Sequence, residues 1–209
     1  MTARTAGEGG VNAVVFDLGG VLIDWDPRHL YRKLIADAGE MERFLAQVCN
    51  GAWNLQQDAG RPFAEAVREL AARHPEASAL IEAYWQRWPE MLGGPIEATV
   101  AVLGELKGRA VPLYALSNWS AETWPHALRR FAFLGWFDGL VISGFEGVAK
   151  PDMAIYRRLI ERYRLIPGQT LYFDDVEANI AAARTLGLIA HRFTDAGTLR
   201  AVLRQARLL

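Results

Sequence analysis

The chain alternates short, predominantly apolar runs with longer stretches in which apolar residues recur every three or four positions. Short apolar runs without strict alternation indicate strands that are buried on both faces, as in a parallel sheet. Such runs occupy residues 11–16, 111–116, 139–142, 170–173 and 188–193. The pattern therefore predicts a parallel sheet built from strands that are widely separated in the sequence.

Amphipathic helical stretches separate the later strands. The helical periodicity covers residues 96–107, 121–131, 152–163, 177–186 and 196–208. Strands that alternate with helices of this length predict a parallel sheet with helices on both of its faces. The expected fold class is thus α/β, with a Rossmann-like parallel sheet core.

Residues 26–94 break this alternation because they show helical periodicity without an intervening strand. The expected helices are 27–38, 40–48, 62–74 and 77–88, and Pro27 and Pro62 suit first-turn positions. A structureless connection of this length would be unusual. We therefore expect an inserted all-α cap at 26–94, a core formed by 11–25 and 95–209, a hinge at Gly93–Gly94 and a flexible tail at 1–10.

Composition excludes several classes of protein. Hydrophobic residues make up 51% of the chain and charged residues 22%, and the formal net charge is -1. This balance is typical of a globular protein and gives no reason to expect binding to nucleic acid or to an anionic membrane. The sequence contains one cysteine, Cys49, and no apolar run near the roughly 18 residues that span a bilayer. Since the first ten residues lack a secretory signal, we expect a cytoplasmic protein; the sequence does not indicate its oligomeric state.

Polar and charged residues follow the ends of several predicted strands. In an open parallel sheet, ligands bind beyond the carboxyl ends of the strands, so these side chains are expected to converge on one edge. The set consists of Asp17, Ser117, Asn118, Lys150, Asp174 and Asp175. Each is common as a helix cap or a turn residue, but their recurrence at successive strand ends favours an active site.

The charges in this set suggest a metal. Asp17, Asp174 and Asp175 carry three negative charges against the one positive charge of Lys150, and such a site would repel a phosphate group. A divalent cation would neutralise it, and oxygen ligands with a phosphate substrate favour Mg²⁺. The residues therefore predict Mg²⁺ as cofactor and an anionic small molecule as substrate.

The strings VVFDLGGVLID, ALSNWS, KP and YFDDVEAN, in this order, resemble the four motifs of the haloacid dehalogenase (HAD) superfamily. The position of the insert also resembles that of the helical cap in this superfamily. The resemblance implies that Asp17 is a nucleophile that forms an aspartyl intermediate. It further implies that the Ser117 hydroxyl and the Asn118 backbone N–H hold the transferring phosphoryl group, and that Lys150 neutralises developing charge.

The resemblance also implies a ligand set. Asp174 would bind Mg²⁺ together with the Asp17 carboxylate and the backbone carbonyl of Gly19. Asp175 would act from behind these ligands or through a water on the metal, and Asn179 would support the turn of the fourth motif. Trp25, Trp53 and Trp119 fall in the insert or near its junctions with the core, and they are expected either to pack the cap or to line a substrate pocket.

One position departs from the pattern. Typical phosphatases of the superfamily carry a second Asp two residues after the nucleophile as general acid and base, and here that residue is Gly19. Candidates by sequence for the missing acid are Asp24, Asp26 and His126. The first hypothesis is a Mg²⁺-dependent phosphatase of a small phosphomonoester. The alternatives are a 2-haloacid dehalogenase, with an Arg from Arg28, Arg32 or Arg43, and a non-catalytic binding protein that retains the fold.

Overall fold

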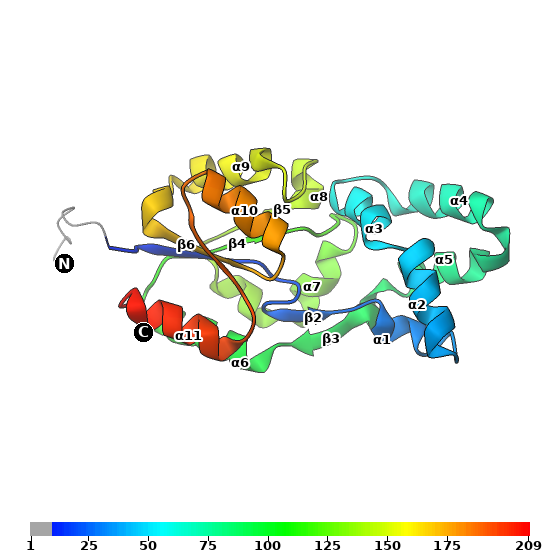
Figure 1. Ribbon diagram of the computed structural model, residues 1–209, viewed down its shortest axis with the longest axis horizontal. Coiled ribbons are helices and arrows are strands. Elements are labelled where there is room, and N and C mark those ends of the chain that lie inside the picture. The colour runs from blue at the N-terminus through cyan, green and yellow to red at the C-terminus, as the bar shows by residue number, and fades with distance from the viewer. Residues whose placement is uncertain (1–9) are drawn as a thin grey trace.

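The computed structural model describes residues 10–209, and its centre is a five-stranded sheet in the order β5-β4-β1-β6-β7 (Figure 1). Every neighbouring pair in this sheet is parallel. The strands are β1 (Ala13–Phe16), β4 (Leu113–Ser117), β5 (Gly139–Ile142), β6 (Thr170–Asp174) and β7 (Ile189–Arg192). The predicted α/β fold is confirmed, with the first strand of the chain at the centre of the sheet.

The register of the central strands brings the polar residues together. Phe16, the last residue of β1, lies opposite Ala115 of β4 and Phe173 of β6. Asp17 and Asp174, each one residue further along, therefore leave the sheet side by side. Ser117 ends β4 one residue beyond the same level.

Helices cover both faces of the sheet. On one face, Val15 and Tyr172 pack with apolar residues of α9 and α10, and on the other, Val14 and Phe16 join a cluster that includes residues of α6 and α11. Figure 1 shows α9 and α10 on the side opposite α6, α7 and α11. The core helices are α6 (Glu97–Gly108), α7 (Trp124–Arg130), α8 (Ser143–Glu146), α9 (Met153–Tyr163), α10 (Glu177–Thr185) and α11 (Ala196–Gln205).

The helices of the insert pack together at one end of the molecule, beyond the sheet (Figure 1). They are α1 (Arg28–Tyr31), α2 (Ala38–Gln47), α3 (Gly51–Asp58), α4 (Phe63–Arg73) and α5 (Ser78–Gln86). They lie between β2 (Ile23–Trp25) and β3 (Leu92–Pro95), which form a two-stranded antiparallel ribbon. Short 3₁₀ helices occur at η1 (Pro75–Ala77), η2 (Trp88–Met91), η3 (Ala132–Trp136) and η4 (Pro167–Gln169).

Several local predictions for the insert and its junctions were wrong. The helix expected at 27–38 is only the four residues of α1, because the Asp37 side chain accepts a hydrogen bond from the Glu40 N–H (2.7 Å) and begins a new helix, α2. The helix α3 was not predicted. Gly93 and Gly94 lie in β3 of the ribbon, and their expected role as a hinge stays a prediction. Residues 121–123 precede α7, which begins at Trp124 rather than at Ala121.

One hydrophobic cluster runs from the sheet into the insert. It contains Phe16 and Leu103 of the core together with Phe63, Tyr84 and Trp88 of the insert. Within residues 10–209, no helix combines the length and the apolar character needed to cross a lipid bilayer. The boundaries of core and cap and the cytoplasmic location stay predictions, and most of the expected tail, residues 1–9, lies outside the described residues.

Candidate active site

Lys150 is the centre of the charged cluster at the carboxyl edge of the sheet. Its Nζ lies 2.8 Å from Asp17 Oδ2 and 2.7 Å from Asp174 Oδ2, and it donates a third contact to the Leu116 carbonyl oxygen (3.0 Å). The side chain of Lys150 is only 1% exposed, and that of Asp174 is fully buried. An ammonium buried this deeply needs a carboxylate partner, because an unpaired charge away from water is costly.

The second and third carboxylates complete an acidic group. Asp17, Asp174 and Asp175 each offer a carboxylate oxygen, and these atoms all lie within 4.8 Å of one another. Oxygen-only donors at this spacing suit a hard divalent cation such as Mg²⁺. Gly19, whose carbonyl was expected as a further ligand, lies two residues beyond Asp17 in the loop that leaves β1.

The pKa shifts in the cluster indicate an excess of negative charge. Burial raises the pKa of Asp17 to about 7; Lys150 opposes this shift, and the charge on Asp174 adds to it. Burial would also raise the pKa of Asp174, but Lys150 and the hydroxyl of Tyr172 outweigh it, so that its pKa is lowered. The pKa of Lys150 is raised despite its burial, because it faces two carboxylates. The single ammonium of Lys150 thus does not balance the charge of all the acids, and a bound cation would reduce the repulsion among them.

Donors from β6 and α10 fix the orientation of Asp174. Its Oδ2 accepts from the Tyr172 hydroxyl (2.5 Å) and its Oδ1 from the Val176 backbone N–H (2.8 Å). Asn179 Nδ2 lies 3.0 Å and 3.1 Å from its two oxygens. Asn179 thus contacts Asp174 directly, and these hydrogen bonds together hold the carboxylate in the orientation in which it would bind an ion.

Asn118 connects the loop after β4 to Lys150. Its Nδ2 donates to the Lys150 carbonyl oxygen (3.0 Å), and its Oδ1 accepts from the Lys150 backbone N–H (2.8 Å). The prediction assigned only the backbone N–H of Asn118 to the site, whereas the side chain is what aligns Lys150. Ser117 is buried at the end of β4, one residue before Asn118.

The two glycines after Asp17 differ in what surrounds them. Gly20 has φ +72°, and a Cβ built there would lie 2.5 Å from Asp175 Oδ2, so only glycine fits beside this carboxylate. A Cβ built on Gly19 meets no atom within 4 Å. Gly19 therefore leaves open space next to the nucleophile position, and this space belongs to a pocket.

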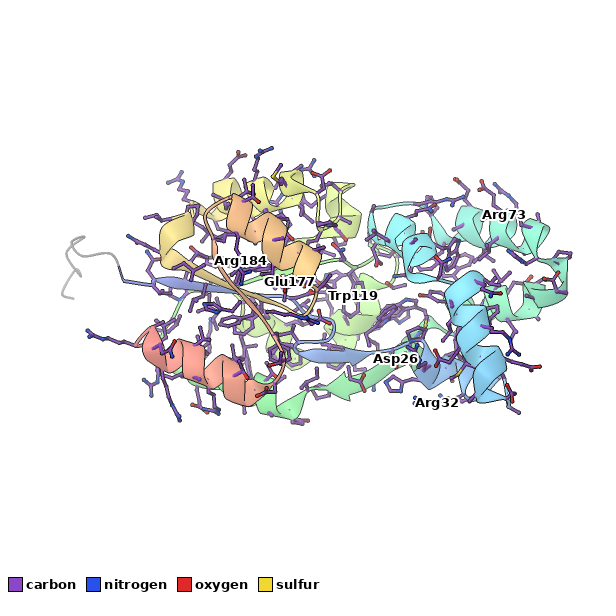
Figure 2. The ribbon with its side chains drawn as sticks, in the orientation of Figure 1. Asp26, Arg32, Arg73, Trp119, Glu177 and Arg184 are labelled. Carbon is purple, nitrogen blue, oxygen red and sulfur yellow. The ribbon has the colours of Figure 1, made fainter. Side chains whose placement is uncertain are left out.

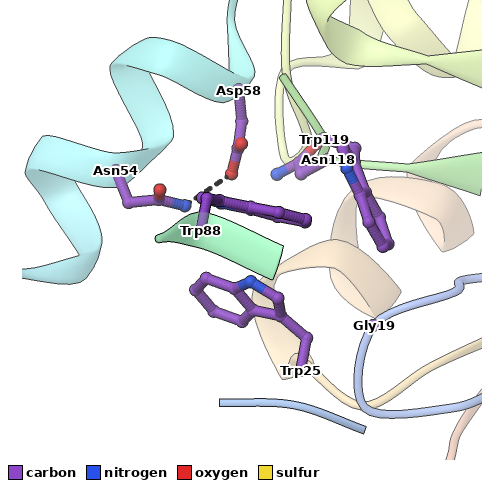
Figure 3. A pocket seen from close by; sticks show the side chains of 7 residues that line it. All are labelled: Gly19, Trp25, Asn54, Asp58, Trp88, Asn118 and Trp119. Atoms are coloured by element: carbon purple, nitrogen blue, oxygen red, sulfur yellow. Dashed lines mark hydrogen bonds between the residues drawn. The ribbon is translucent and has the colours of Figure 1, made fainter. Parts of the chain in front are cut away.

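The pocket is a cavity of about 60 Å³ between the core and the insert (Figure 3). Two of its lining residues, Gly19 and Asn118, follow Asp17 and Ser117 closely in the chain, and Trp119 lies where the core meets the insert (Figure 2). The lining residues are Gly19, Trp25, Asn54, Asp58, Trp88, Asn118 and Trp119.

The structure divides the predicted tryptophans. Trp25 and Trp119 line the pocket, as does Trp88, which was not proposed for it. Trp53 does not line it, because its ring packs edge-on against Tyr84 (5.0 Å between centroids) and against Phe63 (6.4 Å) inside the cap. Asn54 and Asp58, both on α3, were missed together with their helix.

Ser143 ties the cap to the core beside this pocket. Its buried hydroxyl donates to the Asp58 carbonyl oxygen (2.5 Å) and accepts from the Trp119 backbone N–H (2.9 Å). Replacing Ser143 by Ala leaves both groups without this partner, and we expect a loss of about 1–3 kcal/mol in the free energy of unfolding, measured in urea. The matched control Ser78→Ala, in the first turn of α5, should stay within about 0.5 kcal/mol. Equal stability of the two variants would contradict the tether.

Comparison with known proteins identifies the family. The model of the haloacid dehalogenase-like hydrolase family matches residues 11–187. The chain belongs to this family. The chain is thus a hydrolase of the HAD family, as its four motifs indicated.

Individual relatives match most of the length of the chain. The sesquiterpene phosphatase astK of Aspergillus oryzae is 28% identical over 92% of this chain and 95% of its own length. The phosphorylated carbohydrates phosphatase of Thermotoga maritima is 21% identical and covers 90% of both chains. The structure of HAD family enzyme bt-2542 from Bacteroides thetaiotaomicron superposes with a TM-score of 0.70 at 24% identity, over 90% of this chain and 95% of that one. The same enzyme is known in complex with magnesium and inorganic phosphate, at a TM-score of 0.65.

Proposed function

We propose that this HAD hydrolase is a Mg²⁺-dependent phosphatase that acts on a small phosphomonoester through an aspartyl-phosphate intermediate on Asp17. The observation that carries the proposal is the meeting of Asp17, Asp174 and Asp175 with buried Lys150 at the carboxyl edge of the sheet. The phosphatase names of two relatives and the magnesium and phosphate complex of a structural neighbour support it.

In this proposal each residue has a distinct task. Asp17 attacks phosphorus through a carboxylate oxygen. Its Oδ1 accepts a hydrogen bond from the Leu18 backbone N–H (2.7 Å). Lys150 keeps Asp17 ionised and oriented, and it balances charge as the phosphoryl group transfers. Ser117 and the Asn118 backbone N–H hold phosphoryl oxygens. Asp17, Asp174 and the Gly19 carbonyl would hold Mg²⁺, with Asp175 behind them, and the ion would screen the phosphate from the carboxylates.

The pocket suggests what the alcohol part of the substrate is like. Trp25, Trp88 and Trp119 offer apolar ring surface, which favours an alcohol with an apolar body over a highly charged one. The name of the sesquiterpene phosphatase fits this chemistry. Because about 60 Å³ is far below the few hundred Å³ of a pocket for a small molecule, we expect the cap to move away from the core when the substrate enters.

The two alternatives fit the cluster less well. A dehalogenase substrate carries a carboxylate, which Asp174 and Asp175 would repel without a cation. Arg28, the first arginine considered for it, is paired with Asp26 and Glu42 and does not line the pocket. A binding protein without catalysis would have no use for three crowded acids around one lysine.

A phosphatase assay with a metal control tests the proposal. With p-nitrophenyl phosphate, we expect turnover in MgCl₂ that falls by at least about 100-fold in EDTA, because the acids then repel the phosphate. Mg²⁺ should also raise the melting temperature of the wild type, since binding to the folded state alone stabilises it. Chloride release from 2-chloropropionate in EDTA would instead support the dehalogenase. Failure to hydrolyse every phosphomonoester tested would contradict the phosphatase.

A further inference from the structure

The proposed phosphatase reaction lacks a proton donor at the position that Gly19 occupies. The alcohol leaving from phosphorus needs a proton, and the water that later attacks must lose one. Gly19 has no side chain to carry either proton, and the space above it is open. The pocket that contains Gly19 contains one carboxyl group among its lining residues, that of Asp58.

The structure holds Asp58 at the border of cap and core. It is the last residue of α3, and Ser143 of the core binds its carbonyl oxygen. Asn54 Nδ2 donates to Asp58 Oδ2 (2.8 Å), as Figure 3 shows. The Tyr84 hydroxyl in turn donates to Asn54 Oδ1 (2.9 Å), which fixes the amide with its NH₂ group toward Asp58. The carboxyl group is thus oriented by a chain of buried partners.

The environment of Asp58 keeps its proton available near neutral pH. Burial raises the pKa of this carboxyl to about 7, although hydrogen bonds from the Ser120 backbone N–H and Asn54 lower it in part. The other titratable groups on the elements packed around Asp58 already have partners. Tyr84 is hydrogen-bonded to Asn54, and Glu122 accepts from the Phe63 N–H. Ion pairs join Arg61 to Glu65 and Glu69, and Glu146 to Arg158 and Arg162. A general acid works best with a pKa near the operating pH.

The acids expected from the sequence have other partners. Asp24 Oδ2 lies 2.9 Å from His29 Nε2, and Asp26 Oδ1 accepts from Arg28. His126 contacts Arg129 through Nδ1 (3.0 Å). None of the three lines the pocket.

We propose that Asp58, supplied by the cap, is the general acid and base of this active site and replaces the carboxyl group missing at Gly19. The inference rests on the proposed phosphatase function. In the first step an Asp17 oxygen bonds to phosphorus, the bond from phosphorus to the alcohol oxygen breaks, and the Asp58 proton passes to that oxygen. In the second step Asp58 takes a proton from water, the water oxygen bonds to phosphorus, and the bond to Asp17 breaks. Inorganic phosphate leaves, and both residues return to their starting states.

The variant Asp58→Asn tests this with two substrates of similar size. Benzyl phosphate has a poor leaving group that needs a proton, whereas p-nitrophenyl phosphate has one that leaves unaided. For benzyl phosphate we expect kcat/KM to fall by about 10²–10⁴-fold. For p-nitrophenyl phosphate the first step should survive, so that about one equivalent of nitrophenolate appears in a rapid burst before slow turnover. The control Glu82→Gln, an exposed acid of the same cap on α5, should match the wild type.

The open space at Gly19 allows a rescue. Adding Gly19→Asp to Asp58→Asn places a carboxyl group in the same pocket from the other side, and recovery of benzyl phosphate turnover by about tenfold would support the assignment. Two outcomes for Asp58→Asn would overturn it. The first is a fall in kcat/KM by the same factor for both substrates, without a burst of nitrophenolate. The second is benzyl phosphate activity that stays within about threefold of the wild type. Inactivity of the wild type on every phosphomonoester would remove the phosphatase function itself, and this inference with it.

Stability gives a readout that does not depend on turnover. Because the folded-state pKa of Asp58 lies above that of the unfolded chain, the wild type loses stability as pH rises from about 4 toward 7. Asp58→Asn cannot ionise and escapes this loss. We expect its melting temperature to exceed that of the wild type by about 2–4 °C at pH 8 and to approach it at low pH. Equal melting temperatures at both pH values would overturn the claim that Asp58 holds a proton near neutral pH.

Discussion

Replacing Asp17 by Asn should lower kcat for p-nitrophenyl phosphate by at least about 10³-fold, the largest effect that we expect with this substrate. The amide is a poor nucleophile and cannot form the acyl phosphate, so the loss falls on the chemical step rather than on folding. Asp17 directly follows the central strand β1, and its Oδ2 lies 2.8 Å from Lys150 Nζ. Steady-state kinetics in MgCl₂ and trapping of the phosphoenzyme measure the effect.

Two further measurements separate lost chemistry from lost structure. Since the pKa of Asp17 is raised in the folded state, removing its charge relieves repulsion at neutral pH, and Asp17→Asn should be at least as stable as the wild type in EDTA. Asp17→Glu keeps the charge but moves the oxygen by about one bond length, and a loss of about 100-fold or more is expected. Turnover of Asp17→Asn near the wild-type level would refute Asp17 as the nucleophile.

The sequence predicted the sheet and the charged cluster because both follow from local patterns. The apolar runs mark strands buried on both faces, and the carboxyl ends of parallel strands meet at one edge. Asp17 and Asp174 stand at or directly after the ends of the adjacent strands β1 and β6, so adjacency in the sheet brings them together, whereas Lys150 comes from the segment between α8 and α9, after β5, which is not adjacent to either strand. Gly19 was recognised as a departure, and the structure adds that its side of the pocket is open.

The part of the pocket that the cap supplies could not be predicted in the same way. The helix α3 is short, and its apolar positions are few, so that periodicity gives a weak signal. A local signal was present: Asn50 caps this helix by accepting from the Trp53 N–H (2.9 Å). Even with α3 known, the position of Asp58 depends on Ser143, which is 85 residues away in the sequence. For a similar reason the sequence could not decide between the two roles considered for Trp53, since the packing of the cap helices determines which tryptophans face the core.

The raised pKa of Asp58 also lies beyond the reach of the sequence. Asp58 resembles any helical surface acid until the fold partly buries it between the cap and the core. The same applies to Asn118, whose side chain aligns Lys150 from a different loop. Such roles arise from contacts between distant segments, and a single sequence does not encode them in a recognisable motif.

Lys150→Met should produce the largest loss of stability that we expect, together with a loss of activity. The methionine side chain fills a similar volume but leaves Asp17 and Asp174 buried without a counter-charge, at a cost of about 3–5 kcal/mol in the free energy of unfolding. The loss should be greatest in EDTA and smaller in MgCl₂, because a divalent cation held by the same carboxylates supplies positive charge in place of the ammonium. Urea unfolding at neutral pH in both buffers measures the difference.

The control for this variant is Lys107→Met, which removes an exposed lysine whose Nζ lies 3.3 Å from Asp138. An exposed pair contributes at most about 1 kcal/mol, and its loss should not depend on Mg²⁺. Activity separates the variants as well, since Lys107→Met should keep wild-type turnover and Lys150→Met should lose at least about 100-fold in kcat. If Lys150→Met were as stable in EDTA as Lys107→Met, Asp17 and Asp174 would not need the lysine, and the charge balance on which the metal site is argued would be wrong. If Mg²⁺ failed to narrow the gap, the carboxylates would not bind the cation in the way that we propose.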